Sequence, residues 1–337
     1  MPQTTGHVQT RNRMAGVNSL DRSRRPMRQL SLVALLFAVQ FVAPARALEP
    51  VKVTDGVYAF IGGAGEPTVE NAGNIGNSGF IIGDDGVVVV DTGISYRHGR
   101  AMLEAIVRVT PKPVRLAIIT HAVQEFLFGN AAFAERGIPL AAHARSIDLM
   151  RSRCGHCLEN LNKVLGPERM EGSRLVLPDR VVDGSTVLQV AGLKLQLLYF
   201  GWGATPGDLA VYDPASGVLF AGGLVSNRRI PELRDAQLAG WLLALDRLNE
   251  IPARWVVPGH GPVSTPAAIG QTRAYLLALD AKVRAVYSSG ASLLEAVDRV
   301  DLPQYESWDM YPAAHRRNAH QRYLELELAE FGAEVPP

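Results

Sequence analysis

The stretch "VRLAIITHAVQEFLFGN" (114–130) carries the clearest structural signal in the chain. Its first seven residues are mostly apolar and rich in isoleucine and valine, which is typical of a buried β-strand. This strand delivers His121 to a loop, and the residues that follow the loop have a helical pattern. Loops at strand ends often carry the polar chemistry of a protein. We therefore take the turn at 121–130 as the centre of a candidate site.

The residues before this stretch predict strands and one helix. The segment "NSGFIIGDDGVVVVDTG" (77–93) indicates two strands joined by a turn at Asp85 and Gly86, a strong hairpin signal. The segment "VKVTDGVYAFIG" (51–62) alternates as an edge strand does. A helical period follows in "GRAMLEAIVRV" (99–109), which ends before two prolines.

The residues after the stretch predict a further series of helices and strands. We expect, in order, a helix at 128–137, a strand at 138–143, a helix at 145–164, strands near 186–199, a hairpin at 209–222, a helix at 238–251 and a strand at 254–261. From Pro266 the chain is predicted to be helical, with a break at 301–312. Strands this apolar would be buried on both faces if two mixed sheets faced each other with helices outside. The loops at His121 and His260 both follow strands, so we expect them to converge at one rim.

The N-terminal segment "MRQLSLVALLFAVQFVAPARALEP" (27–50) has the charged, apolar and A-x-A order of a secretory signal peptide. Its apolar run of roughly 14 residues is shorter than the ~20 that span a bilayer, which favours a cleaved signal over a membrane anchor. We therefore predict that 1–47 is removed and that the mature protein is periplasmic or secreted, without membrane attachment. The removed part holds seven of the 34 basic and one of the 33 acidic residues, so 27 basic and 32 acidic residues stay. This mildly acidic balance excludes nucleic acid as a partner.

Five segments in order resemble the metallo-β-lactamase superfamily over roughly 51–265. They are "VVVVDTG" (87–93), "ITHAVQEFLFGN" (119–130), "GATPGDLAVY" (203–212), "VLFAGGLV" (218–225) and "VVPGHG" (256–261). The chain is most similar to the periplasmic quinoprotein relay system zinc metallohydrolases, a branch like the hydrolase of sulfur-oxidation operons. The resemblance implies a four-layer αββα sandwich at 48–265 with its site at the sheet rim. A C-terminal helical extension at 266–337 is expected to pack on the same domain.

The resemblance also implies a metal-ligand pattern. It runs His-x-His-x-Asp-His, then a histidine before Thr-Pro-Gly-Asp, an aspartate in a Gly-Asp turn and the histidine of Gly-His-Gly. Three of these positions keep a donor in this chain, namely His121, Glu125 and His260. Four carry side chains without a lone pair, namely Val123, Phe126, Ala204 and Gly223.

Zinc takes four donors in a tetrahedron, of which the protein supplies three at a catalytic site. A two-metal site needs a shared carboxylate to offset the repulsion between the ions, and this chain has Gly223 at that position. We therefore exclude a dinuclear centre and expect at most one zinc, held by His121, Glu125 and His260. The alternative is no metal, with both histidines hydrogen-bonded at the rim of a cleft.

Several other residues have structural explanations. Asp91 and Asp208 are expected to bond backbone amides in tight turns, and they would orient ligands only if a metal were present. Trp202 either lines a pocket or packs in the core. His315 and His320 lie five residues apart in the C-terminal helical region, and we expect both at the surface.

The segment "RCGHCLENL" (153–161) holds the only two cysteines, Cys154 and Cys157. In an oxidising compartment the default for such a pair is a disulfide. At a helix N-terminus beside Arg151 and Arg153, one thiolate would instead be stabilised for redox chemistry. The pair could also bind a metal ion or join a partner protein.

Three functional hypotheses follow. The first is an exported hydrolase homologue acting on an ester, thioester or lactone-like bond, linked by resemblance to quinoprotein dehydrogenases or their cytochromes as partners. The second is a non-catalytic periplasmic protein that binds a small organic ligand, with Val123, Phe126 and Trp202 on the cleft walls. The third is a thiol–disulfide role of Cys154 and Cys157. The sequence leaves enzymatic activity undecided.

Overall fold

The computed structural model describes residues 48–330. The predicted signal peptide at 1–47 lies outside the described residues, as do the last residues of the C-terminal extension. Within 48–330, no helix combines the length and the apolar character needed to cross a membrane.

Twelve strands form two sheets in the described part of the chain. The first sheet has the spatial order β1 (Val51–Thr54), β2 (Val57–Phe60), β3 (Ser78–Ile82), β4 (Val87–Val90), β5 (Val114–Ile119), β6 (Leu140–His143) and β7 (Arg180–Val182). The second has the order β12 (Trp255–His260), β11 (Val218–Ser226), β10 (Ala210–Asp213), β9 (Leu193–Leu198) and β8 (Thr186–Val190). The first sheet is antiparallel up to β4 and parallel from β4 to β7. In the second, only the β11–β12 pair is parallel.

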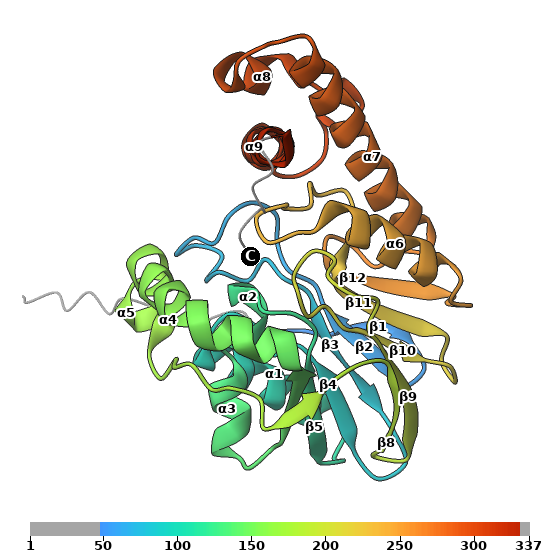
Figure 1. Cartoon of the computed structure of the whole chain (residues 1–337). Helices are drawn as coiled ribbons and strands as arrows, with labels where there is room; N and C mark the ends of the chain where they lie inside the picture. Colours follow the sequence, from blue (N-terminus) through green and yellow to red (C-terminus); the bar gives the residue numbers. More distant parts are fainter. Residues whose placement is uncertain (1–47, 331–337) are drawn as a thin grey trace, which may run out of the picture. The chain divides into compact units, whose positions relative to one another are not determined.

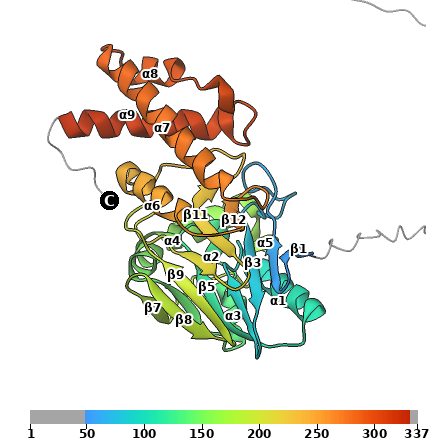
Figure 2. The same ribbon diagram turned by 90° about the vertical axis from the view of Figure 1, so that its right-hand side faces the viewer.

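The two sheets share one apolar layer. Val88 and Ile118 of the first sheet belong to the same buried cluster as Leu197, Val211 and Phe220 of the second. Helices cover the outer faces, so the expected four-layer αββα order is confirmed (Figures 1 and 2).

Helices α1 (Tyr96–Val109) and α3 (Asn130–Glu135) cover the outer face of the first sheet. Helices α4 (Ala144–Leu165) and α5 (Pro167–Met170) pack beside them around a separate cluster that includes Ile119. This outer layer holds the long helix that carries both cysteines.

The second sheet is covered by α6 (Leu238–Asn249) and α7 (Ala267–Ser288), and the remaining C-terminal helices α8 (Leu293–Arg299) and α9 (Arg316–Glu330) pack against α7. Between α8 and α9 lie a short 3-10 helix (Pro303–Tyr305) and a π-helical turn (Tyr311–His315), at the break that the sequence predicts. Trp241 of α6 and Tyr275 of α7 lie in one buried cluster with Leu219 of β11. The helical extension therefore shares the core of the sandwich, while a boundary at residue 265 stays a prediction.

Three local expectations differ from the structure. The segment 51–62 forms two strands, because Gly56 with φ +73° turns the chain between β1 and β2. The sequence does not predict the short edge strand β7, since its three residues are largely exposed and have no apolar period. The helix expected at 128–137 is preceded by another turn of helix, α2 (Gln124–Leu127).

Candidate functional site

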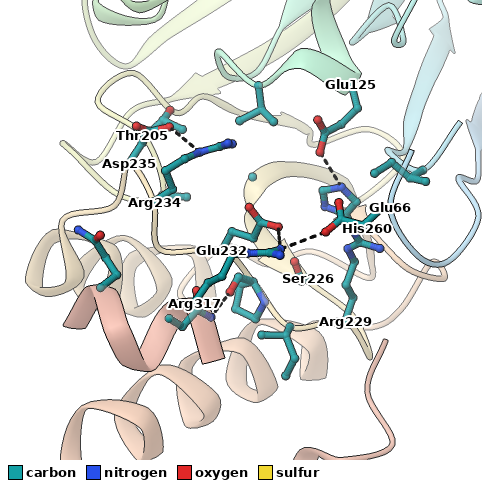
Figure 3. A pocket seen from close by; sticks show the side chains of 18 of the residues that line it. Glu66, Glu125, Thr205, Ser226, Arg229, Glu232, Arg234, Asp235, His260 and Arg317 are labelled. Carbon is teal, nitrogen blue, oxygen red and sulfur yellow. Dashed lines mark hydrogen bonds and ion pairs between the residues drawn. The ribbon is translucent and has the colours of Figure 1, made fainter. Parts of the chain in front are cut away.

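The loops after β5 and β12 meet at one rim, as the sequence predicts, and they border a cleft of about 750 Å³ (Figure 3). His121, Glu125 and His260 line this cleft. The loop after β11 and helix α9 contribute further lining residues, so the C-terminal extension forms part of the wall.

His121 is held by a chain of hydrogen bonds behind the cleft. Its Nδ1 lies 2.7 Å from Oγ1 of Thr120, and that hydroxyl donates to Oδ2 of Asp91 at 2.8 Å. When Asp91 is ionised, the single hydroxyl proton goes to its carboxylate, and Nδ1 of His121 then carries the hydrogen of the bond to Thr120. Burial lowers the pKa of His121 to about 3, which keeps the ring neutral. Its Nε2 is therefore a hydrogen-bond acceptor on a residue that lines the cleft.

Asp91 anchors this chain from the end of β4. The carboxylate is 2% exposed, and its Oδ1 accepts a hydrogen bond from the Thr120 amide at 2.8 Å. The amide that donates this bond lies at the end of the neighbouring strand β5. The sequence predicts instead a bond from an amide within the turn that contains Asp91. Burial raises the pKa of Asp91 to about 7, although the bonds from Thr120 oppose that shift.

Glu125 and His260 form a pair across the rim. Oε1 of Glu125 lies 3.2 Å from Nε2 of His260, and their side chains are 10% and 14% exposed. Burial acts to raise the pKa of Glu125, but the hydrogen bond from His260 and the charge of that ring outweigh it. The pKa of Glu125 is therefore lowered, and the side chain is a carboxylate.

Phe126 packs against both histidines. Its ring centroid lies 4.3 Å from that of His121 and 5.4 Å from that of His260. Gly76 makes room for it, because a Cβ at that position would lie 2.8 Å from the phenyl ring. The phenyl group thus takes space beside the two rings on the buried side of the site.

Gly223 packs directly beneath His121. A Cβ added at Gly223 would lie 2.7 Å from Cδ2 and 2.9 Å from Nε2 of the imidazole, closer than real contacts allow. The imidazole therefore occupies the space that any side chain at position 223 would enter.

The three predicted metal ligands border one cleft, but in the structure they are not arranged around a common point. Among residues 48–330, no group of three or more His, Cys, Asp and Glu side chains has an arrangement that could hold a metal ion. The hydrogen bond between Glu125 and His260 uses one nitrogen of that ring, and Thr120 uses one nitrogen of His121. Residues 48–330 therefore contain no arranged group of ligands for the single zinc ion that the sequence predicts.

The other predicted wall residues are only partly at the cleft. Val123 lines it, whereas Phe126 and Trp202 are absent from the described lining residues. The indole of Trp202 donates a hydrogen bond of 2.7 Å to the carbonyl of Asp235, a residue that does line the cleft. Asp208 accepts hydrogen bonds from the amide and hydroxyl of Thr205 at 2.8 and 2.7 Å, which is a turn-capping role.

The expectation that both C-terminal histidines lie at the surface is wrong for one of them. His315 is 3% exposed, and its ring bonds the Tyr275 hydroxyl at 3.0 Å and the Val300 carbonyl at 2.9 Å. His320 is exposed and lines the cleft. The spacing of the two residues does not tell which helix face is covered.

The cysteines differ from their predicted setting in two ways. Cys154 and Cys157 lie in the middle of α4, ten residues and more from its first residue, and not at a helix N-terminus. Both are free thiols, so the expected disulfide is not present in the structure. Cys154 is buried and Cys157 is half-buried.

Sequence reasoning missed the charged wall of the cleft. Arg229 pairs with Asp309. Arg317 of α9 pairs with Glu66 and Glu232 (Figure 3). A signal for this wall was present in "SNRRIPELRDA" (226–236), where several charges follow an apolar strand. These ion pairs join the C-terminal extension to loops of the sandwich.

Comparisons with known proteins agree with this architecture. The model of the metallo-beta-lactamase superfamily matches residues 72–260. A linear primary-alkylsulfatase of a Pseudomonas species is 24% identical over 66% of this chain, which spans 49% of that enzyme's length. A type 2 metallo-beta-lactamase of Bacteroides fragilis is 23% identical over 72% of this chain and 92% of its own.

Solved structures show the same fold. A metallo-beta-lactamase from Pontibacter korlensis superposes with a TM-score of 0.57 at 24% identity, covering 68% of this chain and 99% of its own. The family match covers more than half of the 337 residues and includes His121, Glu125 and His260. This chain therefore belongs to the metallo-β-lactamase superfamily.

Proposed function

We propose that this protein binds a small organic ligand in its cleft without the help of a metal ion. The superfamily typically binds zinc through histidine and acidic side chains. By resemblance, the corresponding positions here include Val123, Phe126, Ala204 and Gly223, none of which offers a donor. The three remaining donors, His121, Glu125 and His260, would have to bind one ion together, and among the described residues they are not arranged to do so.

The contact between His121 and Gly223 carries this proposal. A bridging acid at position 223 would begin with a Cβ only 2.7 Å from the imidazole, so that acid and His121 in its present place exclude each other. The position that lacks the metal-binding acid is therefore one where the packing of His121 requires a glycine. This supports a cleft whose packing suits a function other than zinc binding. It argues against a zinc site that has lost only one of its ligands.

The cleft has the properties of a small-molecule site. Its volume of about 750 Å³ lies within the range of such pockets. Ile75, Val123 and Ile230 provide apolar wall, while Nε2 of His121 offers an acceptor and the Glu125–His260 pair offers charge. We therefore expect a ligand with an apolar body and a hydrogen-bond donor that reaches His121.

The cellular setting is a proposal from the sequence. The segment 27–50 supports export with cleavage after residue 47, and the resemblance supports a periplasmic quinoprotein dehydrogenase or cytochrome as partner. N-terminal sequencing of the protein recovered from the periplasmic fraction tests the first point. Retention of a purified quinoprotein dehydrogenase on the immobilised full chain tests the second.

The main experiment measures metal content and ligand binding on the same preparation. We expect less than about 0.2 zinc or iron per chain in protein purified without a metal-binding tag, and an unchanged Tm in chelator. A screen of small hydroxy acids, hydroxylated lactones and aromatic alcohols is expected to give a compound that raises Tm in the wild type. His121→Ala is expected to abolish that rise.

The competing prediction is a hydrolase with one zinc on His121, Glu125 and His260. It requires about one zinc per chain and a fall of Tm in chelator. Because two relatives are named an alkylsulfatase and a metallo-beta-lactamase, a primary alkyl sulfate and a β-lactam are suitable substrates. Hydrolysis of either that stops on addition of chelator would overturn the binding proposal.

A further inference from the structure

We propose that Cys154 and Cys157 form a reversible dithiol–disulfide centre, in which Cys157 attacks an external disulfide and Cys154 then closes the bond. Both residues lie on consecutive turns of α4 and are free thiols. This chemistry is separate from ligand binding in the cleft. It does not depend on the function proposed above.

The surroundings of the two sulfurs assign their order of reaction. Cys154 is 1% exposed and packs with Leu127, Ile147 and Leu161, so an external reagent cannot reach it first. Cys157 lies one turn later at the border of that cluster and is half-buried, so its sulfur has access to solvent. In its thiol form, Cys157 donates a hydrogen bond to the Arg153 carbonyl, with 3.5 Å between Sγ and the carbonyl oxygen.

The local charges favour the same order. A hydrogen bond from the Cys154 thiol, with help from the charge of Arg234, lowers the pKa of Cys157 to about 7, although burial and the charge of Asp235 oppose the shift. The same contact, together with burial, raises the pKa of Cys154. The thiolate is the nucleophile in disulfide exchange, and an attacking thiol works best when its pKa lies near the ambient pH. Cys157 meets this condition and Cys154 does not.

The helix turn between the cysteines can close with a small adjustment. Side chains three residues apart on a helix have Cβ atoms about 5–6 Å apart, and a disulfide needs about 3.5–4.5 Å. Gly155 lies inside this turn, where glycine weakens a helix relative to alanine. A Cβ at Gly155 would meet no atom within 4 Å, so packing does not require a glycine there. We infer that it lets the turn tighten.

The exchange balances in two steps. The Cys157 thiolate attacks one sulfur of an external disulfide, which forms a mixed disulfide and expels one thiolate of the reagent. Cys154 then loses its proton to solvent and attacks the Cys157 sulfur, which expels the second thiolate. The external disulfide is reduced to two thiols, and the protein dithiol is oxidised to one disulfide. A bond strained by the helix is readily reduced again by a dithiol.

The test uses the reduced full chain and dithiodipyridine, an aromatic disulfide whose cleavage releases a coloured thione. We expect the wild type to lose two hydrogens and to carry no adduct in its intact mass. Cys154→Ala is expected to keep one pyridyl adduct, because it cannot close the bond. Cys157→Ala is expected to react at least tenfold more slowly. In the wild type, the rate of the first thione release is expected to reach half of its maximum near pH 7. Arg234→Gln is expected to shift this midpoint to higher pH.

A matched pair of glycine variants separates attack from closure. Gly155→Ala is expected to slow the second release severalfold and to leave the first unchanged. Gly270→Ala in α7 is the control, because it also replaces a helical glycine whose Cβ would meet nothing within 4 Å, and both rates should stay as in the wild type. Two stable adducts on the wild type, or a first release with the midpoint of an ordinary thiol, would overturn the proposal. None of these readouts depends on a ligand in the cleft.

Discussion

Glu125 and His260 join the two halves of the cleft, with 3.2 Å between Oε1 and Nε2 across 135 positions of sequence. One residue belongs to the turn after β5 and the other ends β12, so this contact is one of the ties between the two sheets at the rim. Both side chains are nearly buried, which means that each depends on the other for its polar partner.

We expect Glu125→Ala to lower the free energy of unfolding by about 2 kcal/mol, because it leaves the nearly buried His260 without its partner. Glu125→Gln keeps the shape and an oxygen acceptor, so its loss should stay below about 1 kcal/mol. Urea denaturation of both variants, of His260→Ala and of the double variant gives the coupling between the residues. Additive losses in this cycle would show that the contact does not form in solution.

The fold was largely predictable because its inner strands are apolar on both faces. Four consecutive valines in β4 and the run before His121 in β5 favour buried parallel strands over any other structure. The edge strand β7 could not be found in this way, since three largely exposed residues give no periodic signal. The β1–β2 hairpin differs from the single predicted strand for another reason, because the alternation of 51–62 runs on through the turn at Gly56 and does not mark it.

The site was predictable only up to the position of its loops. Strand ends placed His121 and His260 at one rim, and the structure confirms that placement. The packing of Phe126 against both rings and the fit of Gly223 under His121 are tertiary contacts, which no sequence spacing encodes. The burial of His315 was not predictable for the same reason, because its partners come from α7 and from the end of α8.

We expect Gly223→Ala to destabilise the protein by about 1–3 kcal/mol, because the added methyl group overpacks a filled site. The methyl carbon would lie 2.7 Å from the imidazole of His121, which is itself held by Thr120. Thermal or urea denaturation measures the loss. Gly270→Ala should show no loss, since a Cβ there meets nothing within 4 Å.

The same contact predicts a rescue. His121→Ala removes the ring that the new methyl group would meet, so Gly223→Ala should cost much less in that background. A positive coupling of at least about 1 kcal/mol is expected from the four proteins. If Gly223→Ala is equally costly with and without the imidazole, another neighbour or the backbone itself is responsible.

His98 of α1 predicts a loss of stability in acid. Its Nε2 is buried without a hydrogen-bond partner among the described residues, and burial lowers the pKa of the ring to about 4. The unfolded chain binds a proton at this histidine below about pH 6.5, so it takes up more protons than the folded chain between the two values. The stabilisation is complete above that range and is lost as the pH falls through it.

The measurement compares the wild type with His98→Leu in urea at pH 7.5 and at about pH 4. The wild type should lose up to about 3 kcal/mol more than the variant over this interval. The leucine variant controls for all other titrating groups, which both proteins share. Parallel pH profiles of the two proteins would mean that the ring is protonated in the folded state.

Asn77 orders the loop that carries His260, and its replacement should disturb that loop first. Its Nδ2 donates to the carbonyls of Pro258 and Gly261 at 2.8 and 2.7 Å, and its Oδ1 accepts from the Gly62 amide at 2.9 Å. Asn77→Ala removes three hydrogen bonds at a position that is 3% exposed, so we expect a loss of about 3 kcal/mol. Asn77→Asp should cost more, because a carboxylate would face two carbonyl oxygens.

Asn162→Ala is the matched control, because that exposed amide bonds only within its own helix and should cost less than about 0.5 kcal/mol. Amide hydrogen exchange separates local from global effects. In Asn77→Ala, exchange at 259–261 should rise by more than the global loss of stability accounts for, because those backbone groups lose their clamp. A rise that only matches the global loss would show that Asn77 stabilises the core without holding the His260 loop.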